Sequence, residues 1–327
     1  MPKELITFQQ KSIYLNPGYG FNGKPKLGNY SSIFVENITT SIMPIGWKKH
    51  FGQPYFIKIT PNNDEMKTKI NILFPSEFHS CEDIYDNLEN TISGFISNCV
   101  SSLLLHGRQY YEIVPVTINT KYNKIDHILP CDAFTLVKIS GVVIQIGKFF
   151  VQFVPHKLWS KFDKKFIVLS SKSIFKLNFP RIIGGKRTLN NIIKGLNIAD
   201  GEHKTVSQLL EQNLVEKLQF KIKDYYKELD VNKARLIGSW GSLIRMTSNN
   251  NSLEYYEVYK EIQYSYTLAL FREYICTEIE KLLKNIGCNC EITIEGITSS
   301  TEIEKLKIKL QSKEISFKEI FDATSST

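Results

Sequence analysis

The chain has 327 residues, of which 42% are apolar and 23% charged, and its formal net charge at pH 7 is +8. This composition is that of a folded protein and excludes a disordered chain. The first residues carry no apolar segment, and the most apolar run, residues 139–155, contains a lysine and two glutamines, so we expect neither a signal peptide nor a membrane span.

The first half of the chain predicts an irregular start, a helix and then strands. Prolines and glycines in residues 1–80 predict an irregular arm with short strands, "YFIKIT" at 55–60 and "KINILF" at 69–74. Apolar residues recur at helical spacing over 82–106, and Gly107 follows as a C-terminal cap. Alternating runs separated by turns then predict a mostly antiparallel β unit over about 108–180.

The second half is predicted to be largely helical. Residues 188–219 have helical character, 220–252 are mixed, and a long helix is expected over about 253–286, followed by a strand at 290–296 and short helices at 301–311 and 316–322. We therefore predict an α+β fold with four regions. These are an arm with peripheral strands (1–80), a helix with a β-rich region (81–187), a helix with a mixed segment (188–252), and the long helix with its C-terminal elements (253–327).

Basic residues concentrate in the middle of the chain. Residues 1–120 carry 10 basic and 10 acidic side chains, residues 121–252 carry 22 and 10, and residues 253–327 carry 9 and 13. Within 148–187, ten basic residues and one acid, Asp163, interleave with eight aromatic residues. Such a segment can contact phosphate backbones. The alternative is a strand-rich unit with lysines on its exterior and the aromatic side chains in its core.

The motifs of catalysis are incomplete. "GYGFNGKP" at 18–25 has the glycine and lysine spacing of a phosphate-binding loop, but Pro25 stands where Ser or Thr would bind magnesium. Cys288 and Cys290 could offer two thiolates, yet no second pair lies at zinc-like spacing, and the histidines are isolated. The scattered cysteines favour a reducing compartment. We expect no catalytic residue, metal site or cofactor, and hence not an enzyme.

The joint "LLLHGRQYYEIVPV" at 103–116, the turn "NTKYNKID" and the run "HILPCDAFTLVKISGVVIQIG" at 127–147 resemble the same order of elements in portal proteins of tailed bacteriophages. Residues 248–283 resemble the family's long helix after a polar loop, and residues 292–321 its closing strand and helices. The resemblance covers 82–322, and the size points to the upper collar (connector) proteins of small short-tailed phages. The matching positions in the joint and in the run at 127–147 are Gly107, Tyr110, Tyr111, Ile128, Leu129, Pro130 and Phe134.

The resemblance implies a subunit with a wing, a stem of tilted helices and a clip, in a homo-oligomeric ring, usually a dodecamer, at one capsid vertex. Double-stranded DNA passes through the ring during packaging and ejection, driven by a separate packaging ATPase, the terminase. The ring contacts the major capsid protein and carries the tail connector, or lower collar. The protein is therefore expected in the virion, and in the host cytoplasm during assembly.

The same resemblance implies two sets of functional residues. A channel wall must not grip bases, so we expect the polar run before the long helix to be a channel loop; the plainer interpretation is a loop that ends in an N-cap. The candidate channel loop is Thr247, Ser248, Asn249, Asn250, Asn251 and Ser252. The candidate basic contacts to DNA or partners, which would carry no base specificity, are Lys157, Lys161, Lys164, Lys165, Lys172, Arg181, Lys186 and Arg187.

Two alternatives stay open. Another ring protein of the virion, such as a lower collar or tail adaptor, would form a ring without the channel loop. A nucleic-acid-processing enzyme could use the basic segment to bind its substrate, but it needs clustered acids or metal ligands, which no spacing in the sequence indicates.

Overall fold

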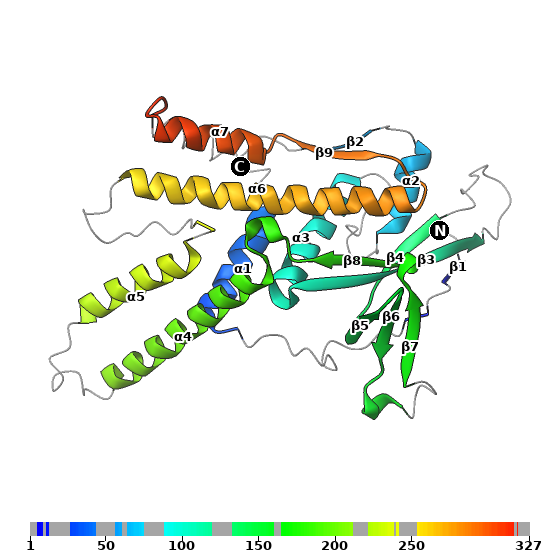
Figure 1. The fold of residues 1–327 in the computed structure, drawn as a ribbon, viewed down its shortest axis with the longest axis horizontal. Helices are drawn as coiled ribbons and strands as arrows, with labels where there is room; N and C mark the ends of the chain where they lie inside the picture. Colours follow the sequence, from blue (N-terminus) through cyan, green and yellow to red (C-terminus); the bar gives the residue numbers. More distant parts are fainter. Residues whose placement is uncertain are drawn as a thin grey trace. The chain divides into compact units, whose positions relative to one another are not determined.

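A computed structural model gives the fold of the chain as two compact units, each built from three segments (Figure 1). The first unit comprises Met1–Pro25, Ile57–Asn178 and Cys276–Thr293, and the second comprises Lys26–Phe56, Phe179–Ile275 and Ile294–Thr327. Helices and antiparallel strands occur together, which confirms the predicted α+β class. The structure describes residues 5–8, 11–12, 27–43, 56–60, 64–74, 88–119, 133–159, 165–211, 222–238, 240–241, 254–316 and 319.

The first unit is organised around one long strand, β3 (Arg108–Asn119). Its first half pairs with β8 (Ile174–Asn178) and its end with β1 (Leu5–Phe8), while β4 (Ala133–Lys138) pairs along its middle (Figure 1). Three residues of β3 that pair with β4 also pair with β8 (Tyr111 and Glu112) or with β1 (Val116), so these two short strands share the edge opposite β4. Between them, the buried carboxylate of Glu112 accepts the backbone N–H groups of Lys11 and Ser12, at 3.1 and 2.8 Å.

Helix α3 (Leu88–His106) leads directly into this sheet. Gly107 ends the helix with φ 70°, and its N–H donates to the Leu103 carbonyl at 2.7 Å, which confirms the predicted cap. The Phe95 ring packs 5.3 Å from the Tyr111 ring of β3. Six residues of the predicted apolar stripe are buried: Ile92, Ile96, Cys99, Val100, Leu103 and Leu104. The other two, Ile84 and the side chain of Leu88, lie outside the described residues, as do residues 82–87 of the predicted helix.

Two predictions about the N-terminal region were wrong. "KINILF" does not form a strand, because it belongs to helix α2 (Asp64–Leu73), where Ile70 and Leu73 are buried on one face together with Phe74, which follows the helix. The supposed irregular arm contains helix α1 (Asn29–Ile42), whose buried residues Phe34, Ile38 and Ile42 follow helical spacing. The predicted strand at 55–60 is confirmed as β2 (Phe56–Thr60), which pairs with β9 (Glu291–Glu295).

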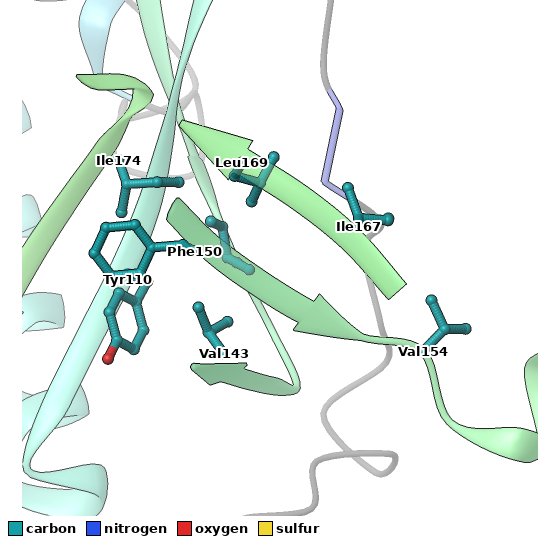
Figure 2. Close-up of a cluster of buried hydrophobic side chains, with 8 residues drawn as sticks. Tyr110, Val143, Phe150, Val154, Ile167, Leu169 and Ile174 are labelled. Atoms are coloured by element: carbon teal, nitrogen blue, oxygen red, sulfur yellow. The ribbon is translucent and has the colours of Figure 1, made fainter. Parts of the chain in front are cut away.

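A second sheet of the first unit contains β5 (Val142–Ile146), β6 (Phe149–Phe153) and β7 (Phe166–Ser170), all antiparallel. One of its faces packs against β3 and β8, as Figure 2 shows. The Phe150 ring lies 5.7 Å from the Tyr110 ring, edge to face. The buried side chains of this cluster are Tyr110, Ile139, Val143, Phe150, Val154, Ile167, Leu169 and Ile174.

The second unit is helical. Helix α1 packs on α4 (Gly185–Glu211), and α4 packs on α5 (Ile222–Ile237). The Gly28 N–H, just before α1, donates to the Asn197 side chain of α4 at 2.8 Å. Helix α7 (Ser300–Gln311) packs Ile303 and Leu310 against Val258 and Ile262 of α6.

The predicted long helix is confirmed as α6 (Glu254–Asn285). Its residues up to Ile275 belong to the second unit and those from Cys276 to the first. Apolar residues at helical spacing form one buried face of this helix: Leu268, Phe271, Ile275, Ile279, Leu282 and Leu283. Ile286, just after the helix, is half-buried. Of the predicted helix at 316–322, only Ser316 and Glu319 lie within the described residues.

Candidate nucleic-acid interface

A buried aromatic residue, Trp240, anchors the chain shortly before the segment that precedes α6. The candidate channel loop, 247–252, lies outside the described residues, but Trp240 and Gly241 before it and α6 after it are described. The Trp240 indole N–H donates to the Ile183 carbonyl at 3.0 Å. Its ring stacks on the Phe179 ring, with centroids 5.7 Å apart, and also contacts Phe34 of α1 at 5.5 Å. The anchor thus joins segments from three parts of the second unit.

Gly241 fixes the next point of the chain against α6. Its φ is +75°, and a Cβ atom there would lie 2.3 Å from both the Lys260 carbonyl oxygen and the Tyr264 nitrogen. Only glycine fits such an approach to a helix backbone without displacing it. The Tyr264 hydroxyl donates to the Asn37 carbonyl at 3.2 Å, which ties the same turn of α6 to α1. Twelve residues of the sequence lie between this fixed point at Gly241 and the start of α6 at Glu254.

Of the eight predicted basic contacts, the structure describes five side chains, and all five are exposed. Lys165 and Lys172 belong to the first unit, whereas Arg181, Lys186 and Arg187 belong to the second. The side chains of Lys157, Lys161 and Lys164 lie outside the described part of the chain. The five residues thus fall into two groups, one in each unit.

The group in the second unit surrounds the start of α4. The short 3-10 helix η5 (Arg181–Ile183) ends at Gly184 and Gly185, which have φ values of 95° and 67°. Their N–H groups donate to the carbonyls of Arg181 and Pro180, at 2.9 and 3.1 Å. The first turn of α4 carries no acid. The helix dipole therefore adds to the positive charge of Lys186 and Arg187.

The structure adds a basic residue that sequence reasoning did not identify. Lys194 is exposed on α4, seven residues after Arg187, and therefore lies on the same face two turns further along. The i, i+7 spacing of the two residues could have indicated this once α4 was assigned as a helix. Arg187 and Lys194 can contact two points along a phosphate backbone.

The group in the first unit lies on and beside the β5–β6–β7 sheet. The Lys165 Nζ atom lies 4.8 Å from the centre of the Trp159 ring, a cation–π contact that orients the lysine. The Trp159 ring packs on His156, 4.4 Å away, and its N–H donates to the Val154 carbonyl at 2.9 Å. Lys172 lies in the 3-10 turn η4 (Ser171–Ser173), where its backbone N–H donates to Ser170 and its side chain is exposed.

The aromatic residues of this basic segment do not all form core. Phe150, Phe175 and Phe179 are buried, as the alternative interpretation expects. Phe149, Phe153 and Phe166 are instead among the exposed large hydrophobic residues. A lysine-coated exterior over an aromatic core therefore explains only part of the segment.

Four cysteines of the described residues form no disulfide bond. These are Cys99, Cys276, Cys288 and Cys290. Burial, the neighbouring Cys288 and Glu280 raise the pKa of Cys290 to about 11, so this thiol stays protonated at neutral pH. In the described ranges, no group of three or more His, Cys, Asp and Glu side chains is placed to hold a metal ion. Over the same residues, every helix is too short or too polar to cross a membrane.

Comparison of the chain with protein-family models gives no match, and comparison with curated proteins gives none either.

Proposed function

We propose that the chain is the subunit of a bacteriophage portal, the upper collar that forms a ring at one capsid vertex. Double-stranded DNA passes through this ring during packaging and ejection, and the tail attaches to it. The observation that carries the proposal is the anchored segment of the second unit. Two packed helices, α4 and α5, lead to the fixed Trp240–Gly241 turn, and a polar segment follows before the long helix α6.

This arrangement suits a channel wall for a physical reason. A segment that touches moving DNA must hold its position in the ring without binding bases tightly. The fixed Gly241 before the segment and the packed helix α6 after it would supply the position, and the serines and asparagines of 247–252 would offer weak polar contacts without net charge. The exposed charges of Lys186, Arg187 and Lys194 on α4 act on phosphates alone, which is contact without sequence preference.

The proposed function implies a set of binding partners. The subunit would bind its own copies, double-stranded DNA, the major capsid protein, the terminase and the lower collar protein, and would lie at the portal vertex of the virion. A ring interface is heterologous and closes by rotation, so each subunit uses two different surfaces toward its neighbours. No step in this function requires a catalytic residue of the chain.

Negative-stain electron microscopy of the purified, nuclease-treated protein tests the proposal. The expected particles are rings of about twelve subunits with a central hole. Nuclease treatment excludes aggregates held together by DNA. A monomeric protein with metal-dependent nuclease activity contradicts the proposal and favours the enzyme alternative.

The channel role of 247–252 has a separate test. Deleting these six residues is expected to leave ring assembly intact and to impair DNA packaging or retention. Loss of folding on this deletion would assign the segment to the core instead.

A further inference from the structure

The β5–β6–β7 sheet carries apolar residues on both faces. Directly opposed residues of antiparallel strands point to the same face, and successive residues alternate between faces. The register therefore assigns Val143, Ile167, Phe150 and Leu169 to the inner face, and these four are among the buried residues labelled in Figure 2. The outer face consists of three cross-strand rows: Val142–Phe153–Phe166, Ile144–Val151–Val168 and Ile146–Phe149–Ser170.

This outer face is large, apolar and open to solvent. Eight of its nine positions are apolar, and six of them are between 40% and 59% exposed. At about 100 Å² for each half-exposed side chain, these six present on the order of 600 Å². That is the upper end of the largest patch on a typical monomer, and it approaches the roughly 800 Å² that each partner contributes to a stable interface. The six residues are Ile144, Ile146, Phe149, Phe153, Phe166 and Val168.

The charges around this face determine what can cover it. The described residues between 133 and 187 include no acidic side chain, and Lys148, Lys165 and Lys172 are exposed on or beside the sheet. Two copies that met face to face would place these lysines against one another, so a symmetric pair is disfavoured. The complementary surface must therefore carry acids. Residues 253–327 of the same chain hold four more acidic than basic side chains.

We propose that the outer face of the β5–β6–β7 sheet is one side of the contact between neighbouring copies of this chain, and that it packs against an acid-bearing surface of the neighbour's residues 253–327. This inference rests on the proposed function, because the ring supplies the neighbour. A contact between two different surfaces is what a closed ring requires. It also explains why aromatic side chains in a basic segment remain outside the core.

Single-stranded nucleic acid is the other class of ligand for a basic, aromatic sheet. Bases stack on aromatic rings, and Phe149, Phe153 and Phe166 could provide them. The aliphatic positions, Val142, Ile144, Ile146, Val151 and Val168, outnumber the aromatic ones, however, and offer bases no stacking surface. The composition of the face therefore favours a protein surface.

Charged substitutions on the face provide the test. Val168→Asp and Phe166→Asp change exposed positions, so folded subunits are expected, with the wild-type circular dichroism spectrum. Their particle size is measured by light scattering after size exclusion. We expect at least a tenfold loss of the assembled fraction in both variants, while Ile33→Asp, which changes an exposed isoleucine of α1, keeps it. Assembly of both sheet variants at the wild-type level overturns the inference and leaves the proposed function standing; a monomeric wild type overturns both.

A labelling experiment avoids any effect of added charge on folding. Val168→Cys places a thiol on the outer face, and its reaction with a maleimide is followed by mass spectrometry of the labelled peptide. We expect the reaction in assembled particles to be at least tenfold slower than in the unassembled fraction. Equal rates in the two fractions contradict the inference. Binding of a fluorescent single-stranded oligonucleotide that Phe166→Ser abolishes, with assembly unchanged, assigns the face to nucleic acid and also overturns it.

Discussion

The ring of Phe179 lies parallel to that of Trp240, with 5.7 Å between centroids and 6° between planes. Phe179 precedes η5 and α4, whereas Trp240 follows α5, so the stack joins the two ends of the α4–α5 pair. Phe271 of α6 packs edge-on against Phe179 at 5.4 Å. The cluster of Phe179, Trp240 and Phe271 therefore holds the two ends of the α4–α5 pair together and packs them against α6.

Trp240→Ala is expected to destabilise the protein strongly. The substitution leaves a cavity among buried aromatic rings and removes the hydrogen bond to the Ile183 carbonyl, which together cost about 3–5 kcal/mol. Urea unfolding followed by circular dichroism measures the loss. Trp159→Ala is the matched control, since Trp159 is 36% exposed and Trp240 only 2%. Equal losses in the two variants contradict the buried anchor.

Gly241→Ala is expected to disrupt the approach of the chain to α6. An added Cβ would meet backbone atoms of α6 at 2.3 Å, and backbone cannot move aside as a flexible side chain does. Gly287→Ala provides the control: its φ of +84° matches the +75° of Gly241, but no atom lies within 4 Å of an added Cβ. We expect a cost of about 1–2 kcal/mol for Gly287→Ala from backbone strain alone, and a larger one for Gly241→Ala. A similar melting temperature for both variants would show that the close approach is absent.

Local patterns predicted some of these elements and could not predict others. The helix before Gly107, the cap itself and β3 followed from periodicity and one glycine. Helix α1 was missed because its β-branched residues and asparagines have weak helical preference, and packing on α4 compensates for that. The contact of Phe179 with Trp240 joins residues far apart in sequence, and no spacing indicates it. Strands with apolar residues on both faces suggest that both faces are buried. The exposure of Phe149 and Phe166 therefore could not be predicted from the sequence either.

Neutralising the basic face of α4 is expected to weaken DNA binding without changing its sequence preference. The triple variant Lys186→Ala, Arg187→Ala and Lys194→Ala should show a shallower plot of the logarithm of the binding constant against the logarithm of the salt concentration. The slope should fall by up to about 0.9 for each phosphate that the variant no longer neutralises. Fluorescence anisotropy with duplexes of two different sequences measures it. The control removes three exposed lysines elsewhere, Lys281, Lys284 and Lys309, and should keep the wild-type slope. Equal slopes for the two triple variants would show that binding depends on net charge rather than on this face.

The capping box of α7 gives a pH-dependent contribution to stability. Glu302 accepts hydrogen bonds from the backbone N–H and hydroxyl of Ser299, both at 2.8 Å, and these lower its pKa below the ordinary 4.5. A lowered folded-state pKa stabilises the fold at neutral pH, and this stability is lost as pH falls through that pKa. Ser299→Ala should therefore cost about 1 kcal/mol at pH 7 and less in acid. Ser312→Ala, whose hydroxyl donates to the Lys309 carbonyl, is the control without this pH dependence.

The most direct measurement of the central claim, that this chain surrounds DNA as a ring, is a threading experiment. Assembled protein is added to linear duplex DNA that is blocked at one end by a bulky protein. The second end is then blocked in one sample and left free in another. Both DNAs are washed in about 1 M salt, which screens the contacts to phosphates. An encircling ring stays on the doubly blocked DNA and slides off the DNA with a free end. Equal retention on both DNAs, or none on either, contradicts the account.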